Sequence, residues 1–195
     1  SDPSANITPK QSSPFIDIHT SGGSIGTIFG GGNGVGVEDK VVVLLNNTSD
    51  TVHTVGTIFG GNNVDDMLDV VPDIRLTQGV VNTVFGGANN GVMGAKKNFT
   101  DMLGNVVSNV STHVVLESPH VTVLDTVFGG NRMSDVEGTS YVEVRNTKGT
   151  GVNYVFGGND ISGNITGIAR VDISGGTVHN LFGGSDGRYD FVEIG

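Results

Sequence analysis

The chain has 195 residues, the length of one compact domain or of one stretch of a repeat array. It contains 32 glycines, no cysteine, and ten basic against twenty acidic residues, for a formal net charge of -10. This composition favours short strands joined by glycine turns over a helical bundle, and it excludes disulfides, thiol catalysis and cysteine-based zinc sites. The charge argues against nucleic acid as a partner, and no stretch has the roughly 18 apolar residues of a membrane span, so no membrane insertion is expected.

The chain begins with a polar segment, residues 1–13, which we interpret as a linker before a repeat domain at residues 14–195. Short alternating strands are predicted at 15–18, 141–144, 170–173 and 191–194. Each is followed by a Ser/Asn/Gly turn, a second strand that ends in phenylalanine, a Gly-Gly corner and a variable polar loop. A unit with one apolar face cannot bury that face alone, so the units are expected to stack.

The second strand and its corner recur six times as an aliphatic residue followed by Phe-Gly-Gly. The phenylalanines are 30, 26, 43, 28 and 26 residues apart, a regularity that chance does not explain. They are Phe29, Phe59, Phe85, Phe128, Phe156 and Phe182, and the first glycines after them are Gly30, Gly60, Gly86, Gly129, Gly157 and Gly183.

These repeats predict an all-β fold, a single-stranded right-handed parallel β-helix (β-solenoid) of about six to seven coils. The phenylalanines are expected to stack inside it, and each Gly-Gly to form a corner with positive φ where a Cβ would meet the next rung. Asn62, Asn131 and Asn159 follow the glycines and are expected to hydrogen-bond along the stack. A propeller is the competing repeat fold, but its blades need about 40–45 residues.

The longest spacing contains an insertion near residues 91–109, in which residues 95–103 are predicted as the only helical turn. The last five residues start a further coil, so we expect the parent protein to continue beyond Gly195.

The densest acidic cluster lies in the loop after the second Phe-Gly-Gly. It is a candidate calcium site, because calcium binds six to eight oxygen ligands, and a solvated loop is the alternative. No other cofactor is expected. The cluster consists of Asp65, Asp66, Asp69 and Asp73.

A second set of carboxylates occupies the outward position of the first strand in different coils: Asp17, Glu143, Asp172 and Glu193. We expect a solvated face on which Arg145 and Arg170 balance the stacked negative charges. Carboxylates on one face of a β-helix are also typical of polysaccharide lyases and hydrolases, which use acid pairs or calcium.

Two further patterns favour structural roles. Residues 22–26 match the G-x-S-x-G nucleophile motif, but Ser24 occupies the repeat position that Thr177 fills in a later unit. The histidines fall at different repeat positions and are interpreted as scattered surface residues that form no metal site: His19, His53, His113, His120 and His179.

Threonine stands two positions before phenylalanine in four successive units, as Thr27, Thr57, Thr83 and Thr126. If both residue types point inward, alternation turns the aliphatic residue between them outward, as a stripe for binding or self-association. In the alternative, the corner falls between the aliphatic residue and phenylalanine, and both are core. The residues of this candidate interaction face are Ile28, Ile58, Val84, Val127, Val155 and Leu181.

Residues 152–159 and 176–184 resemble the glycine-rich "SGGTVxxVFGGG" repeats of large bacterial surface proteins, many of them β-helix adhesins of gut Bacteroidetes. The resemblance extends over about residues 14–195. It implies a secreted or cell-surface, non-enzymatic protein that binds a host glycan or an extracellular protein, or that serves as a stalk. A β-helical carbohydrate-active enzyme, of the polysaccharide lyase or hydrolase class, and a self-assembling structural rod are the alternatives.

Overall fold

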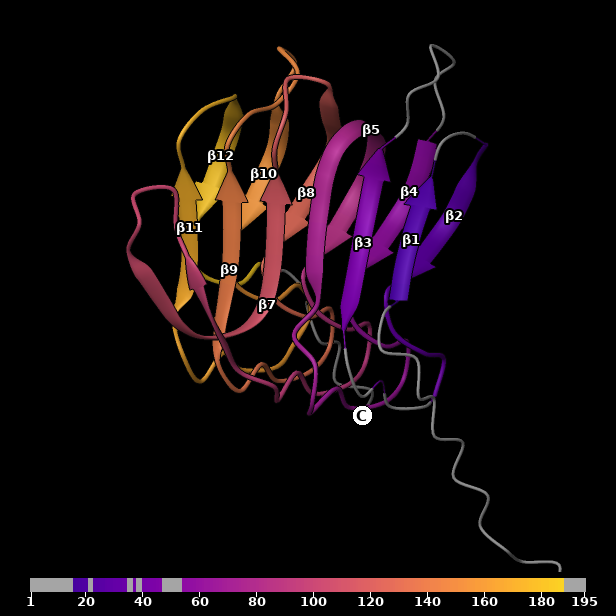
Figure 1. Ribbon diagram of the computed structural model, residues 1–195, viewed down its shortest axis with the longest axis vertical. Helices are drawn as coiled ribbons and strands as arrows, with labels where there is room; N and C mark the ends of the chain where they lie inside the picture. The colour runs from indigo at the N-terminus through magenta and orange to yellow at the C-terminus, as the bar shows by residue number, and fades with distance from the viewer. Residues whose placement is uncertain (1–15, 21–22, 35–36, 38–39, 47–53, 188–195) are drawn as a thin grey trace, which may run out of the picture.

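The structure, a computed structural model, describes residues 16–20, 23–34, 37, 40–46 and 54–187, which contain β-strands, turns and bends but no helix. The chain forms a solenoid whose two long sides are parallel β-sheets and whose third side consists of loops (Figure 1). The first sheet comprises β1 (Ile16–Thr20), β3 (Val41–Asn46), the start of β5 (Asp73–Phe85), the end of β7 (Val106–Leu116), β9 (Thr139–Val144) and β11 (Ala169–Ile173). The second sheet comprises β2 (Ile25–Phe29), β4 (Thr54–Phe59), the end of β5, β8 (Val121–Phe128), β10 (Val152–Phe156) and β12 (Val178–Phe182).

Each strand of the solenoid pairs in parallel with the corresponding strand of the next repeat, and the repeated phenylalanines are register partners throughout the second sheet. The all-β solenoid prediction is therefore confirmed, and the propeller alternative is wrong. The stack has about five turns, slightly fewer than the six to seven expected. The predicted linker at residues 1–13 lies outside the described residues.

The third side of the solenoid consists of the loops that follow each Gly-Gly. Isolated parallel bridges connect these loops from turn to turn, for example Met67 to Met93, Met93 to Val136, and Val136 to Ile165. Their side chains complete the core, where Met67, Met93 and Val136 are fully or almost fully buried. The loops therefore close the cross-section without forming a third continuous sheet.

The aliphatic residue before each phenylalanine points into the solenoid. Valine and isoleucine suit this position because branched side chains pack well on a pleated, buried surface. The expected outward stripe is therefore wrong. The alternative holds in that the aliphatic residues are core and the phenylalanines are buried as well, although the phenylalanines form a separate cluster. The buried members are Ile28, Ile58, Val84, Val127 and Val155, whereas Leu181, in the last described turn, is half exposed.

The Gly-Gly corners are required by close approach of the rungs. A Cβ on Gly60 would meet the carbonyl oxygen of Gly86, and one on Gly86 would meet that of Gly129. The predicted positive φ is wrong for these corners. Positive φ occurs instead at Gly79 (φ 133°), where β5 turns from the first sheet into the second.

The insertion forms a β-hairpin and not the predicted helical turn. Its strand β6 (Lys97–Thr100) pairs antiparallel with the first half of β7. The turn is stabilised by the Asp101 carboxylate, which accepts hydrogen bonds from the backbone N–H groups of Leu103 and Asn105, and by Gly104 at φ 85°. A side chain that caps a tight turn stabilises the backbone in a non-helical conformation, which overrides the local helix propensity.

Candidate functional site

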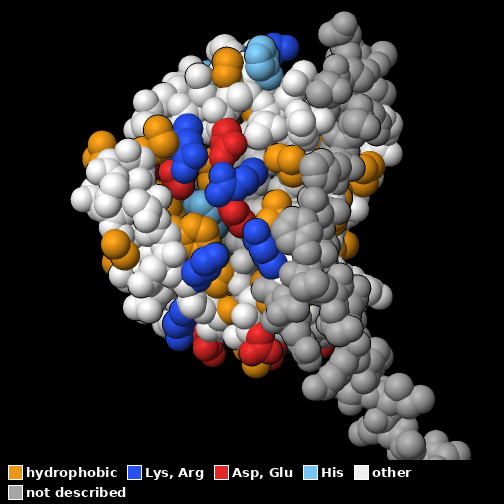
Figure 2. All heavy atoms as spheres, viewed as in Figure 1, with side chains coloured by type: hydrophobic (Ala, Val, Ile, Leu, Met, Phe, Trp, Pro, Cys, Tyr) orange, Lys and Arg blue, Asp and Glu red, His pale blue; other side chains and the backbone are white. Residues whose placement is uncertain are grey.

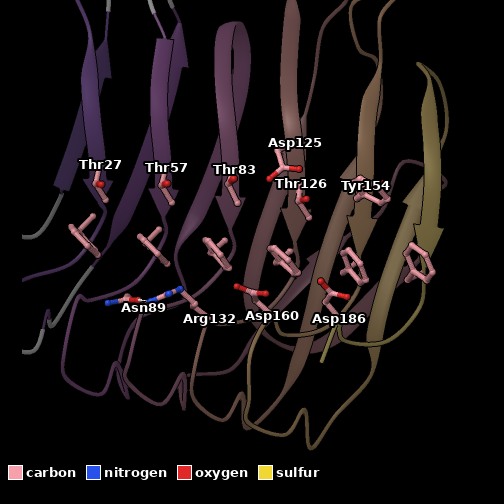
Figure 3. A pocket seen from close by; sticks show the side chains of 16 residues that line it. Thr27, Thr57, Thr83, Asn89, Asp125, Thr126, Arg132, Tyr154, Asp160 and Asp186 are labelled. Atoms are coloured by element: carbon pink, nitrogen blue, oxygen red, sulfur yellow. Dashed lines mark hydrogen bonds between the residues drawn. The ribbon is translucent and has the colours of Figure 1, made fainter. Parts of the chain in front are cut away.

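A groove runs along the outer surface of the second sheet, and a ladder of phenylalanines forms its floor (Figure 3). Neighbouring ring centroids lie 4.6 to 5.1 Å apart, with interplanar angles of 5° to 16°. Stacking of the repeated phenylalanines is therefore confirmed, but on the outside of the sheet. Because each ring face is covered by its neighbour, the rings present their edges to the groove. The rings from Phe59 to Phe156 are only 4% to 6% exposed.

One wall of the groove is the threonine column. Thr27, Thr57, Thr83 and Thr126 are register partners along the sheet, and Tyr154 takes the same position in the next turn. Figure 3 shows these side chains in a row beside the rings. The column therefore presents hydroxyl groups at the spacing of the rungs.

The opposite wall is a column of polar residues placed four positions after each phenylalanine. Asn63 donates to Asn33 at 2.7 Å, Asn89 donates to Asn63 at 2.8 Å, and the Arg132 guanidinium donates to Asn89 at 3.1 Å. Asp160 and Asp186 continue the column. The groove lined by these two walls and the rings has a volume of about 650 Å³.

The regular pattern of the groove is broken in the fourth and fifth turns. In β8, Val123 pairs with Val81 and Thr126 with Thr83, so the two residues Leu124 and Asp125 stand opposite a single residue. This is a β-bulge, a feature that redirects side chains. Asp125 lines the groove here, beside the turns in which arginine replaces asparagine and tyrosine replaces threonine (Figure 3).

The predicted asparagine ladder lies behind the groove wall and is confirmed. Asn62, Asn131 and Asn159 are fully buried. The Asn131 side chain accepts a hydrogen bond from the Ala88 N–H at 2.7 Å and donates to the carbonyls of Gly91, Ser134 and Asp135. Side-chain amides thus satisfy the backbone of the third side, where strand pairing is sparse. The ladder holds the groove wall in place.

A second cluster of polar side chains lies on the outer face of the first sheet, where blue and red side chains gather in Figure 2. His113 is at its centre, with Nδ1 2.9 Å from Asp73 and Nε2 2.9 Å from Glu143. Arg75 bonds Asp73 at 2.9 Å and Glu117 at 2.8 Å, while Arg145 lies 3.0 Å from Glu143 and 3.5 Å from Glu117. The six groups form a closed ring, which we call the histidine ring. The pairing of Arg145 with Glu143 confirms the expected counter-charge.

The geometry of this ring favours the charged form of His113. A neutral imidazole has only one N–H, so it cannot donate to two carboxylates. Burial by itself lowers the pKa of His113, but the hydrogen bonds and charges of Asp73 and Glu143 outweigh it and raise that pKa above its ordinary value. Burial raises the pKa of Asp73 and Glu143, but His113 and the nearby arginines bring the pKa of both carboxyls below the ordinary range.

The insertion hairpin covers the histidine ring. Phe99 of β6 contacts one side of the His113 imidazole at 4.3 Å between centroids, and Tyr141 stacks on it at 5.0 Å. The prediction that the histidines are surface residues is therefore wrong for His113, and the expected solvated face is wrong for Glu143, which is 2% exposed. The prediction of surface histidines holds for His120 and His179, which are exposed. His53 and the His19 side chain lie outside the described residues.

Of the other carboxylates in the predicted outward column, Asp172 is less buried than Glu143. Asp172 accepts a hydrogen bond from the Tyr141 hydroxyl and pairs with Arg170 at 2.8 Å, as the counter-charge expectation requires. The Asp17 side chain and Glu193 lie outside the described residues. Arg170 also bonds Asp101 at 2.9 Å, so this arginine ties the turn of the hairpin to β11.

The candidate calcium residues do not converge. Asp65, Asp66 and Asp69 lie on the exposed third side, and Asp66 accepts a hydrogen bond from the Val92 N–H, whereas Asp73 belongs to the histidine ring. Within the described ranges, no group of three acidic or histidine side chains is placed to hold a metal ion. Ser24 lies in an exposed turn followed by strand β2, so the strand–turn–helix context of the nucleophile motif is missing.

Sequence reasoning missed the residues that distinguish the groove, namely Asp125, Arg132, Tyr154, Asp160 and Asp186. Two signals in the repeat alignment mark them. The fourth unit has one extra residue before its phenylalanine, and the fourth position after phenylalanine changes from asparagine to arginine and then to aspartate. Both signals are differences between repeats, whereas an alignment that looks for shared residues reveals only what the repeats have in common.

Comparison with protein-family models, curated proteins and solved structures finds no match to this chain. None of the described segments is a helix with the length and hydropathy needed to cross a bilayer. The arguments for function therefore rest on the groove and its chemistry.

Proposed function

We propose that the chain is a non-enzymatic β-helical binding domain of a secreted or cell-surface bacterial protein, and that its groove holds an extended host glycan or extracellular protein. The observation that carries this proposal is the shape of the groove. It runs past the phenylalanines of six strands, from Phe29 to Phe182, and is lined by repeated threonine hydroxyls on one side and by polar side chains from Asn89 to Asp186 on the other. A long shallow site of this kind fits an extended ligand better than a compact metabolite.

The test blocks the groove without altering the fold. Thr83 and Asn82 are neighbours in β5, but only Thr83 lines the groove, while Asn82 is exposed elsewhere on the strand. Thr83→Arg places a long side chain across the floor, and Asn82→Arg is the matched control. A panel of purified host extracellular-matrix proteins, mucin and linear polysaccharides is tested against all three proteins. We expect at least one ligand that the wild type and Asn82→Arg retain and Thr83→Arg loses. Equal retention by both variants, or no ligand at all, contradicts the proposal.

A β-helical carbohydrate-active enzyme is the second candidate. It is favoured by Asp125 and Asp160, which Figure 3 shows on opposite sides of the phenylalanine ladder, because a pair of carboxylates flanking a substrate is the arrangement that glycoside hydrolysis uses. Prolonged incubation with the same polysaccharides decides between the two. The binding function predicts no new reducing ends and no unsaturated products. Product release that is lost in both Asp125→Asn and Asp160→Asn indicates the enzyme.

A further inference from the structure

The spacing along the groove discriminates between classes of extended ligand. Its repeated features recur every 4.6 to 5.1 Å, as the ring centroids show. Side chains on one face of an extended peptide recur about every 6.6 Å, and those of a polyproline II helix about every 9 Å. Neither stays in register with the rungs over several turns. The pyranose rings of an extended polysaccharide follow one another at a spacing close to that of the rungs.

The chemistry of the lining also suits a sugar chain. Threonine hydroxyls and asparagine amides both donate and accept hydrogen bonds, as sugar hydroxyl groups do. The ring edges that form the floor carry the positive part of the aromatic quadrupole, which favours contact with oxygen atoms, although the phenylalanines from Phe59 to Phe156 are only 4% to 6% exposed. Tyr154, 38% exposed at the fifth turn, adds a hydroxyl group and an aromatic surface.

The charges of the lining favour an uncharged chain. Three carboxylates (Asp125, Asp160 and Asp186) and one guanidinium (Arg132) line the groove, and Arg132 already donates to Asn89. The whole chain carries a net charge of -10. A uronate-rich or sulfated polysaccharide is repelled by this field, whereas carboxylates accept hydrogen bonds from neutral sugar hydroxyls and strengthen them.

We propose that the groove binds a linear, uncharged polysaccharide that lies along the solenoid axis, with its closest contacts at the accessible side chains of Asp125, Arg132 and Tyr154. This inference rests on the proposed binding function and names its ligand class. The subsite is placed where the β8 bulge turns Asp125 into the groove and the two wall columns change residue type. In the other turns, the threonine column and Asn89 hold the chain in register without distinguishing one sugar from another.

The experiment titrates the intact chain calorimetrically with cellohexaose, mannohexaose and xylohexaose as neutral probes and hexagalacturonate as the anionic probe. We expect at least one neutral hexaose to bind, with an affinity that changes little with salt, and hexagalacturonate to bind at least about tenfold more weakly. Tyr154→Ala and Asp125→Asn are each expected to weaken binding about tenfold, as the loss of a charged or aromatic contact does. Asp69→Asn, an exposed carboxylate outside the groove, serves as the matched control and should bind as the wild type does.

The inference is overturned if no neutral hexaose binds, if hexagalacturonate binds more tightly, or if both subsite variants bind as the wild type does while their circular dichroism is unchanged. The ligand class and the binding function can be refuted separately. If every neutral hexaose fails but a panel protein is still lost on Thr83→Arg, the ligand class is wrong and the binding function stands. If no ligand depends on Thr83, both are wrong.

Discussion

Replacing His113 by glutamine tests how much the charged contacts of the histidine ring stabilise the fold. The imidazole side chain is 2% exposed and bonds two carboxylates, of which Glu143 is also 2% exposed. Glutamine has no charge and cannot reproduce both bonds, so Asp73 and Glu143 lose the buried cation between them and each keeps only its arginine, Arg75 or Arg145. Breaking a buried ion pair in this way costs about 3–5 kcal/mol in the free energy of unfolding. At about 2–4 °C per kcal/mol for a chain of this length, Tm should fall by about 6–20 °C.

The pH dependence of the same variant has a definite sign. Because the folded pKa of His113 is raised, its stabilisation is fully present below the unfolded value of about 6.5 and is lost as the pH rises through the folded pKa. The lowered pKa values of Asp73 and Glu143 act in the opposite sense, and their stabilisation is lost in acid as the pH falls through the folded values. The wild type should therefore lose stability as the pH rises from about 6.5 through the raised pKa of His113, and His113→Gln should lack that loss.

Thermal unfolding followed by circular dichroism between about pH 5 and pH 10 measures both effects. His120→Gln, at an exposed histidine in a turn, is the matched control and should change neither Tm nor its pH profile. A loss below about 1 kcal/mol, the range of a surface ion pair, would refute the reasoning, as would an unchanged alkaline profile in His113→Gln.

The remaining predictions concern the corner, the asparagine ladder and the hairpin. Gly86→Ala should destabilise the fold by about 2 kcal/mol or more in urea unfolding, because the new Cβ meets the Gly129 carbonyl. Gly149 has open space around it, so Gly149→Ala should change the free energy of unfolding by less than about 0.5 kcal/mol. Equal effects of the two substitutions would show that the close approach of the rungs does not restrict the corner. Asn131→Ala leaves the Ala88 N–H without its buried acceptor and should lower the free energy of unfolding by at least about 1–3 kcal/mol. A smaller decrease would mean that the asparagine ladder does not stabilise the fold. Phe99→Ala uncovers His113 and should lower the free energy of unfolding by about 1–3 kcal/mol. Amide hydrogen exchange in this variant should be faster in β6 than in β10. Equal exchange rates in the two strands would contradict the covering role of Phe99.

The repeat made the architecture predictable from sequence, because identical residues at nearly constant spacing have one simple arrangement, a stack in register. Phe59 and Phe85 pair as that argument requires, and Asn131 bonds along the stack as expected. The prediction for the faces of the second sheet is wrong, because it puts the phenylalanines inside the solenoid. The structure places Ile58 and Val84 there and packs the rings against one another outside.

The errors in the insertion and the histidine ring have other causes. The hairpin depends on a local turn, in which the Asp101 carboxylate accepts hydrogen bonds from Leu103 and Asn105. The histidine ring depends on contacts between segments far apart in the chain, such as Asp73 with His113, 40 residues away. A repeat alignment compares equivalent positions and carries no information about a unique hairpin. His113 sits in the only unit that carries the insertion, so no other repeat offered a precedent for a buried, charged histidine.

The most direct test of the groove as the binding face is methyl NMR of the threonines during titration with a ligand that the chain retains. Thr27, Thr57, Thr83 and Thr126 line the groove, whereas Thr112 is buried beneath the first sheet, with its hydroxyl bonded to the Gly129 carbonyl. The binding account predicts saturable shifts in the groove threonines, largest at Thr126 beside the bulge, and no shift at Thr112. Binding that leaves all four groove methyls unmoved would contradict it.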